Sequence, residues 1–480
     1  MTAERFRPGY HFSARRNWLN DPNGLVWYDG EYHLFYQHNP YGTDWGHMSW
    51  GHAVSPDLVH WTELTPAIVA TDDEHVFSGS VVVDHRNTSG LAIDDRPAMV
   101  AVYTSADPVT GWQAQSLAAS HDRGRTWHRY DRNPVLDIGS ADFRDPKVFW
   151  YEPDRCWVMV VALAAEHIVQ FYASDDLVNW RHLSDFGPAG ASSGLWECPD
   201  LFPLTIDGQT VWVLVVSVAT GAVAGGSGTQ YFLGHFDGKS FVVQDPGHDG
   251  EVGIAPATWL DFGADYYAAV SYGDTPDGER VLIGWMNNWG YAAATPTEAF
   301  RGSMSFPRVH RLARVAGRLV LTQQPVPALE SLRGDSFEYG DLELNDGVHE
   351  LPNHKYGEQL ELHATFRPGT AERFGIRLRE TEVGYDIAEG SLYLDRTKGQ
   401  VGVHPDFAAV HSAPLGLHDG TVVIRLLVDM ASVEVFGGIG EAVITDQIFP
   451  QSGNHRIELF AEHGTVAIEQ LRLTTLPSTL

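Results

Sequence analysis

A repeated unit of about 60 residues is the feature of this sequence that most constrains its fold. In the first 300 residues, a polar turn closed by an aromatic residue occurs four times, ending at Trp61, Trp127, Trp180 and, more weakly, Phe241. A second series keeps step with the first and places a small polar or acidic residue before an apolar run, at Asp21, Ser80, Asp145, Asp200 and Asp265. Two series of similar period predict one supersecondary unit repeated along the chain.

Such a unit is long enough for four short strands and their turns. The composition agrees, because 11% aromatic residues, 48 Gly and 26 Pro favour strands and turns over helices. A four-stranded unit repeated around an axis is a propeller blade, and the first strands of all blades surround one channel. We therefore predict an all-β chain in which residues 1–325 form a five-bladed β-propeller. A β-sandwich with incidental spacing is the alternative.

The repeat ends at a proline-bearing connector, which we assign to residues 326–337. Longer runs with alternating polar and apolar residues follow at 359–366, 374–379, 421–428 and 455–460. Alternation of period two is typical of strands with one buried face and one polar face turned outward. Residues 338–480 are therefore predicted to form a C-terminal β-sandwich domain, in which we find no catalytic cluster.

Charge and composition exclude several functional classes. The chain has 32 Lys and Arg against 62 Asp and Glu, a net charge of −30, which disfavours nucleic acids and anionic lipids as partners. No apolar run approaches the roughly 18 residues of a membrane span. Two cysteines, Cys156 and Cys198, allow at most one disulfide, and neither a four-cysteine zinc site nor a His-Glu-x-x-His motif is present, so no metal or cofactor is expected.

The first residues contain charges but no apolar segment of the kind found in signal peptides. This predicts a cytoplasmic protein, and a secreted protein whose leader has been removed is the alternative. The sequence does not indicate an oligomeric state.

Three acidic residues lie in segments that proline makes rigid: Asn20-Asp-Pro-Asn-Gly24, Arg144-Asp-Pro-Lys147 and Glu197-Cys-Pro-Asp200. An Asp-Pro pair by itself is more often a turn. These three, however, coincide with the predicted first strands of blades one, three and four, so their carboxyl groups should meet in the channel. A pair of carboxyl groups, one ionised and one protonated, is what glycoside hydrolysis needs.

These segments, together with Phe77-Ser-Gly-Ser80 and the run from Arg301 to Arg308, resemble in order the signature of glycoside hydrolase family 32. That family contains invertases, levanases, inulinases and other β-fructosidases. The resemblance covers nearly the whole chain, since residues 428–436 are similar to a stretch of the family's C-terminal sandwich. One departure is Leu19, where the family commonly has Met. The stretch from Trp45 to Ala53 looks more like the levanase and exo-inulinase branch than like plant invertases.

The resemblance implies a role for each acidic residue: Asp21 as nucleophile, Glu197 as acid/base and Asp145 as stabiliser of the transition state. It also implies contacts with the fructosyl unit at Asn20, Gln37, Trp45, Phe77, Ser78, Arg144 and Trp289.

The implied activity is that of a retaining, exo-acting β-fructofuranosidase. Its substrate would be a fructoside, namely sucrose, a fructo-oligosaccharide, levan or inulin, and the sequence does not choose among them. Retention requires the two carboxyl groups to lie roughly 5 to 5.5 Å apart. The alternatives are an inverting propeller arabinosidase or xylosidase, and a catalytically inactive fructan-binding protein.

Overall fold

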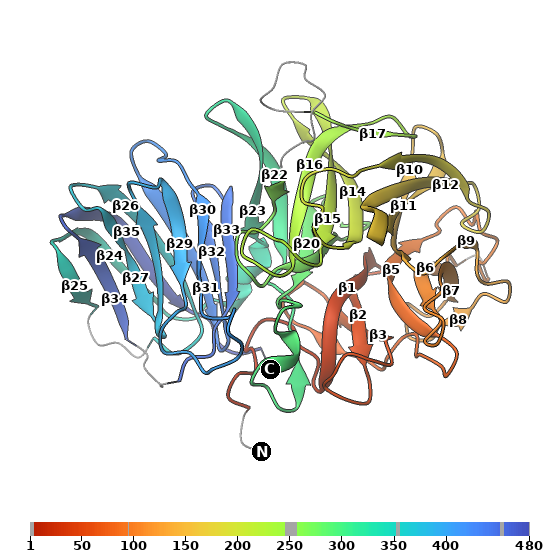
Figure 1. Ribbon diagram of the computed structural model, residues 1–480, viewed down its shortest axis with the longest axis horizontal. Helices are drawn as coiled ribbons and strands as arrows, with labels where there is room; N and C mark the ends of the chain where they lie inside the picture. The colour runs from red at the N-terminus through yellow and green to blue at the C-terminus, as the bar shows by residue number, and fades with distance from the viewer. Residues whose placement is uncertain (1–3, 95, 245–256, 352–355, 452–455, 480) are drawn as a thin grey trace.

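The computed structural model describes residues 4–94, 96–244, 257–351, 356–451 and 456–479. Five sheets followed by two larger ones confirm the predicted five-bladed β-propeller and C-terminal β-sandwich. Figure 1 shows the propeller on the right and the sandwich on the left. The helices of the described residues are three short 3₁₀ segments, η1 (Ala164–Glu166), η2 (Ala292–Ala294) and η3 (Pro327–Leu332). None is long enough to cross a membrane.

The blades are sheets whose first strands contact one another. Blade one contains β1 (Asn17–Tyr28), β2 (Glu31–Asn39), β3 (Ser49–Ser55) and β4 (Thr62–Glu63). Blade two contains β5 (His75–Val83), β6 (Met99–Ala106), β7 (Gln113–Ser120) and β8 (His128–Arg129), with β9 (Leu136–Ser140) beside β7. Blade three contains β10 (Phe143–Tyr151), β11 (Cys156–Leu163), β12 (Ile168–Ser174) and β13 (Arg181–Phe186).

Blade four contains β14 (Trp196–Ile206), β15 (Gln209–Val218), β16 (Gly228–Phe236) and β17 (Phe241–Val243), with β18 (Thr258–Trp259) beside β16. Blade five contains β19 (Tyr267–Ser271), β20 (Arg280–Trp285), β22 (Arg308–Val315) and β23 (Arg318–Pro325). The short strand β21 (Phe300–Arg301), from the blade-five segment, pairs in parallel with β1. This pairing ties the last blade to the first.

The repeated polar turn connects the third strand of a blade to the fourth. In blade one, Asp57 Oδ1 accepts hydrogen bonds from the backbone N–H groups of Val59 and His60. Asp176 makes the same pair of hydrogen bonds in blade three, with Val178 and Asn179. Asp and Asn favour such turns because their side chains can bind the backbone two or three residues further on. The repeat seen in the sequence is therefore a structural turn rather than a binding motif.

Each first strand has a shift in register near the channel. The shifts fall between Leu19 and Pro22, Phe77 and Gly79, Arg144 and Lys147, Glu197 and Asp200, and Tyr267 and Val270. A bulge of this kind bends the strand, so that a side chain points in a direction that it would not take in a regular strand. Three residues beside these shifts have left-handed backbones: Asp145 (φ 66°), Cys198 (φ 47°) and Ala268 (φ 53°). Left-handed residues also occur in turns, but where they lie within strands, as here, they mark strain of the kind that clusters at active sites.

The last member of the polar series departs from the expected placement in the channel. Asp265 lies two residues before β19, and its Oδ2 accepts a hydrogen bond of 2.6 Å from Arg396 in the sandwich. Its remaining oxygen, Oδ1, accepts one from the hydroxyl of Tyr291. The fifth repeat therefore contributes to the junction between the domains, and the channel receives Tyr267 instead.

The sandwich consists of two six-stranded antiparallel sheets. One contains, in spatial order, β24 (Ser336–Leu344), β35 (Val466–Thr475), β26 (Leu360–Pro368), β31 (Val422–Asp429), β32 (Ser432–Gly437) and β33 (Ala442–Gln447). The other contains β25 (Gly347–Glu350), β34 (Ile457–Glu462), β27 (Arg373–Leu378), β28 (Thr381–Asp386), β29 (Ser391–Asp395) and β30 (Val410–Pro414). Their apolar faces enclose a core that includes Leu362, Phe366, Phe374 and Val435.

Buried ion pairs join the sandwich to the propeller. The imidazole of His11 lies between Asp429 Oδ2, at 2.8 Å, and Glu434 Oε1, at 2.7 Å. The guanidinium of Arg308 donates to Glu434 Oε2, at 3.1 Å, and to Asp261 Oδ2, at 2.9 Å. Glu434 alternates with apolar residues along β32, yet its side chain is fully buried and contacts His11 and Arg308 of the propeller.

Candidate active site

The three acidic residues from the proline-bearing segments meet around Cys198. Its backbone N–H donates a hydrogen bond of 2.9 Å to Asp145 Oδ2. Its Sγ lies 3.5 Å from Asp21 Oδ2 and 3.6 Å from Asp145 Oδ2. Since Glu197 precedes Cys198, carboxyl groups from β1, β10 and β14 share one site. Cys156 and Cys198 are both free and buried, so the one disulfide that the sequence allowed is absent.

The Cys198 thiol was not predicted from the sequence to be a site residue. Its position between Asp21 and Asp145 makes it a hydrogen-bond partner of both. Burial and the surrounding carboxylates raise the pKa of this thiol well above its ordinary value. The thiol therefore stays protonated and can donate.

Asp21 is 9% exposed and is surrounded by donors. Oδ1 accepts a hydrogen bond of 3.0 Å from the amide of Asn20, and Oδ2 accepts one of 2.8 Å from the hydroxyl of Ser78. Asn20 is itself held by the indole N–H of Trp18, at 2.7 Å. These donors fix the orientation of the carboxylate, and each of them favours its ionised form.

Glu197 receives one hydrogen bond on each oxygen. The Nε of Arg144 donates to Oε1 at 3.1 Å, and the hydroxyl of Tyr267 donates to Oε2. Arg144 is in turn held by Gln113 Oε1 and Asp142 Oδ1, both at 3.2 Å. Tyr267 lies at the shift in β19, is fully buried, and was not predicted, because no motif surrounds it.

Burial, followed by repulsion between the carboxyl groups, dominates the electrostatics of the site. Burial and the charge of Glu197 raise the pKa of Asp145 to about 7, against the opposite effect of Arg144. Burial and Glu197 also raise the pKa of Asp21, while hydrogen bonds from Asn20, Ser78 and Cys198 lower it. The contribution from Glu197 vanishes when that residue is protonated. A proton on Glu197 therefore makes it easier for Asp21 to be ionised.

Aromatic side chains continue from this cluster towards solvent. Trp45 is 49% exposed, and its ring lies 6.0 Å from Phe77 and 6.4 Å from His75. Trp289 packs on Trp18 at 6.0 Å, and its ring centroid lies 6.4 Å from Tyr267. Such rings can pack against the C–H faces of a sugar while the polar groups below bind its hydroxyls.

The predicted contact residues differ in their relation to the carboxyl groups. Asn20, Ser78 and Arg144 hydrogen-bond to Asp21 or Glu197 directly. Gln37 is buried on β2, and its amide donates to the carbonyl of Val76 beside Phe77, at 3.1 Å. Among the described residues, no group of three or more His, Cys, Asp or Glu side chains is placed to hold a metal ion.

Comparisons with known proteins agree with this geometry. Residues 11–325 match the family model of the glycosyl hydrolases family 32 N-terminal domain, and residues 328–475 match that of the family 32 C-terminal domain. The levanase of Bacillus subtilis (strain 168) is 44% identical, over 98% of this chain and 71% of that protein. An extracellular exo-inulinase of Aspergillus niger is 40% identical, over 98% of this chain and 94% of that protein.

Solved structures give the same result. The crystal structure of an exo-inulinase from Aspergillus awamori superposes with a TM-score of 0.94 at 38% identity, covering 100% of both chains. A β-fructofuranosidase from Schwanniomyces occidentalis, complexed with fructosyl-erythritol, superposes with a TM-score of 0.91 at 31% identity, covering 99% of both chains. The chain therefore belongs to glycoside hydrolase family 32.

Proposed function

We propose that this protein is a retaining, exo-acting β-fructofuranosidase that releases terminal β-D-fructofuranosyl units from fructans, fructo-oligosaccharides and sucrose. The observation that carries the proposal is the meeting of Asp21, Asp145 and Glu197 around Cys198. Levanase and exo-inulinase relatives support a fructoside as substrate.

In the first step, an oxygen of Asp21 attacks C2 of the fructosyl unit while Glu197 donates its proton to the leaving oxygen. The bond from C2 to the leaving group breaks, and a covalent fructosyl ester forms on Asp21. The donors on Asp21 support this role, because they hold an ionised oxygen in a fixed direction.

In the second step, water attacks C2 and Glu197, now ionised, accepts the proton of that water. Asp21 leaves as a carboxylate, and fructose is released with its original configuration. Asp145 serves as an acceptor for sugar hydroxyls and as a negative charge beside the developing oxocarbenium ion. Its fixed backbone and its bond from Cys198 suit both tasks.

Exo-action agrees with the surroundings of the carboxyl groups. Asn20, Asp21, Ser78 and Asp145 are all buried at the base, and the half-exposed Trp45 lies further out. A site whose polar groups are buried in this way accepts a chain end more readily than the middle of a polymer.

A parallel assay on sucrose, 1-kestose, levan and inulin tests the proposal. The wild-type protein should release fructose from at least the fructans, and Asp21→Asn should lower the rate by several orders of magnitude, because the covalent route is lost. Arabinose or xylose release without fructose release would favour the inverting alternative. Binding of fructan without hydrolysis would favour the inactive fructan-binding alternative.

A further inference from the structure

A polar cavity that shares no lining residue with the carboxyl cluster lies where the connector meets the outer face of the sandwich. It has a volume of about 320 Å³. Its walls include the start of η3 at Pro327, the aromatic ring of Phe436 and four basic side chains: Arg333, His363, Arg425 and Arg472. None of these residues belongs to the candidate active site.

Three of the basic residues form a row across neighbouring strands. His363 on β26 is paired directly with Arg425 on β31 and with Arg472 on β35. Residues opposite one another on antiparallel strands have Cβ atoms about 4.5 to 5.5 Å apart and point to the same face of the sheet. Like charges in that arrangement destabilise a sheet. The row therefore needs a compensating negative charge.

One buried carboxylate supplies part of that charge. Glu361, 2% exposed, receives hydrogen bonds from Arg333 Nε at 2.7 Å and Arg425 Nε at 2.9 Å. A second acid, Glu330, approaches Arg333 at 3.5 Å but is 76% exposed. Arg472 has no hydrogen-bond or ion-pair partner among the described residues. Glu338 on β24 lies opposite Arg472 in register, but it is exposed and the two form no ion pair. Of the charged side chains that line the cavity itself, four are basic and one, Glu330, is acidic.

The electrostatics of His363 agree with this count. Burial lowers its pKa, and Arg425, Arg472 and Arg333 lower it further, while Glu361 acts in the opposite direction. Burial also lowers the pKa of Arg425, and Arg333 and Arg472 add to the effect against Glu361. An anion in the cavity would relieve these repulsions.

We propose that this cavity binds a small tetrahedral oxyanion of the phosphate class. Guanidinium groups suit such a ligand because their N–H groups form a planar fork that matches two of its oxygens. The guanidinium of Arg472, which has no partner among the described residues, is available to the anion. His363, once protonated, donates a further hydrogen bond. Arg333 follows η3 in the connector, while Arg425 and Arg472 belong to the sandwich, so a bound anion would link the two.

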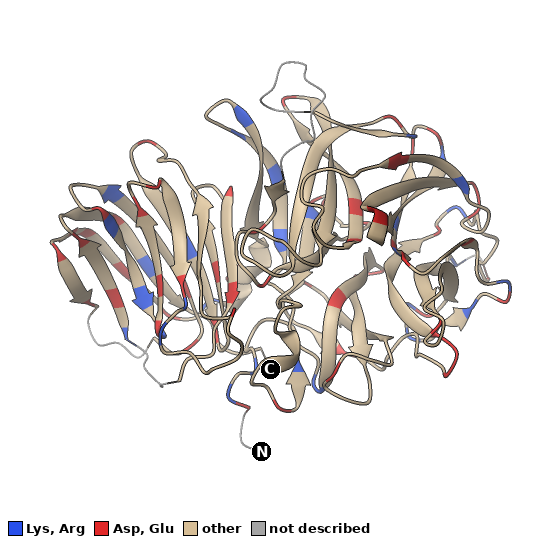
Figure 2. Ribbon diagram, in the orientation of Figure 1, with Lys and Arg blue, Asp and Glu red and all other residues tan. Residues whose placement is uncertain are grey.

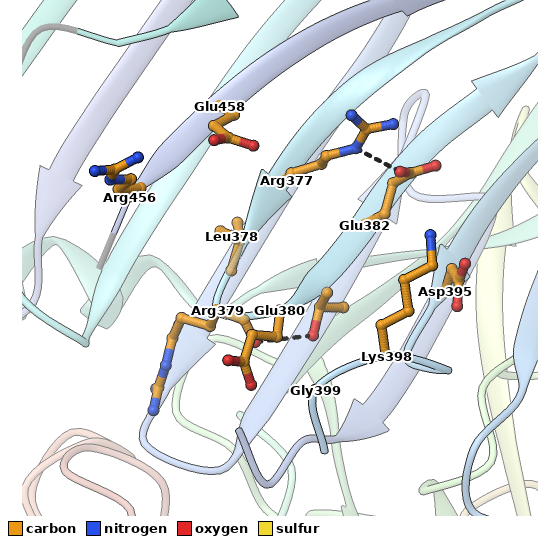
Figure 3. A pocket seen from close by; sticks show the side chains of 11 residues that line it. Arg377, Leu378, Arg379, Glu380, Glu382, Asp395, Lys398, Gly399, Arg456 and Glu458 are labelled. Carbon is orange, nitrogen blue, oxygen red and sulfur yellow. Dashed lines mark hydrogen bonds and ion pairs between the residues drawn. The ribbon is translucent and has the colours of Figure 1, made fainter. Parts of the chain in front are cut away.

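Another cavity of the sandwich provides a matched comparison (Figure 3). Its volume is about 270 Å³, and four basic and four acidic side chains line it. Arg377 Nε donates to Glu382 Oε2 at 2.6 Å within it. Charge is therefore balanced in that cavity. Elsewhere in the sandwich, acidic and basic positions are intermixed (Figure 2).

Isothermal titration calorimetry with inorganic phosphate, at constant ionic strength set with NaCl, tests the proposal. The wild-type protein should bind one anion per chain in a saturable manner. Arg472→Gln should weaken binding by about tenfold or more, the effect of losing a hydrogen bond to a charged group. Arg377→Gln should bind as the wild type does. Because Arg472 has no protein partner, the melting temperature of Arg472→Gln without phosphate should match the wild type.

Sulfate, which stays a dianion from pH 6 to pH 8, tests the part played by His363. It should bind more tightly at pH 6 than at pH 8, and His363→Gln should remove that dependence. A hexose monophosphate that binds more tightly than phosphate would identify a phosphate ester as the ligand, and equal or weaker binding would identify the free anion. The absence of saturable binding, or equal binding by Arg472→Gln and wild type, would overturn the proposal.

Discussion

Raising the pH towards 9 and beyond should weaken the junction between propeller and sandwich, because His11 then loses the proton that it shares with two buried carboxylates. Burial alone would lower the pKa of His11, but hydrogen bonds with Asp429 and Glu434, and their charges, raise it to about 9. Both carboxyl groups are buried as well. Hydrogen bonding with His11 and its charge, against burial, lower the pKa of Asp429 to about 2.

The magnitude follows from the difference in the pKa of His11 between the folded and unfolded chain. An unfolded histidine titrates near 6.5, and at about 1.4 kcal/mol per pKa unit the rise to about 9 corresponds to about 3 kcal/mol of stability. The folded pKa is the higher one, so this stability is fully present below pH 6.5 and is lost as the pH rises through 9. Asp429 behaves in the opposite way, since its contribution is present above pH 4 and is lost as the pH falls through about 2.

Urea unfolding followed by tryptophan fluorescence, from pH 6.5 to 9.5, measures the effect. Over this range the free energy of unfolding of the wild type should fall by about 3 kcal/mol more than that of His11→Gln, which cannot titrate at this position. Other groups titrate equally in both proteins and cancel in the difference. An NMR titration of the His11 imidazole in the wild type gives an independent reading. Parallel pH dependence of the two proteins, together with a His11 pKa near 6.5, would refute the reasoning.

Three further predictions concern catalysis. Glu197→Gln should lose several orders of magnitude of activity on sucrose. With an activated fructoside, azide should restore its turnover by displacing Asp21 from the fructosyl ester, giving β-fructosyl azide, a product that Asp21→Asn should not form. Tyr267→Phe should lower kcat about tenfold to a hundredfold, since Glu197 loses the hydrogen bond on Oε2. Tyr266→Phe, whose hydroxyl has no hydrogen-bond partner among the described residues, should leave kcat unchanged. Chromatography of levan or inulin digests at a few per cent conversion should show fructose, and abundant di-, tri- and tetrasaccharides without matching fructose would contradict exo-action.

The repeat made most of the fold predictable from the sequence. Asp21, Asp145 and Glu197 are separated by 124 and 52 residues, yet their phase within the repeat places them on first strands that share one channel. The turn motifs were visible because each blade uses the same side-chain hydrogen bonds, as Asp57 and Asp176 show. A turn that forms the same hydrogen bonds in successive blades therefore appears in the sequence as a recurring motif.

The residues that were missed depend on contacts without such a pattern. Tyr267 resembles any aromatic residue of a strand, and only the register shift beside Ala268 places it at Glu197. Glu434 alternates with apolar neighbours as an exposed residue would, and its burial depends on His11, 423 residues away. Alternation identifies the two faces of a strand but not which domain covers the polar one.

The anomeric configuration of the first product tests most directly whether Asp21 acts as a nucleophile in partnership with Glu197. Carbon NMR can follow C2 of fructose, which carries no proton, during the first moments of hydrolysis of a β-fructoside. Attack by Asp21 followed by attack of water inverts C2 twice, so β-fructofuranose should appear first and the α form should follow by mutarotation. Initial formation of α-fructofuranose would mean a single displacement by water and would contradict the assignment of Asp21.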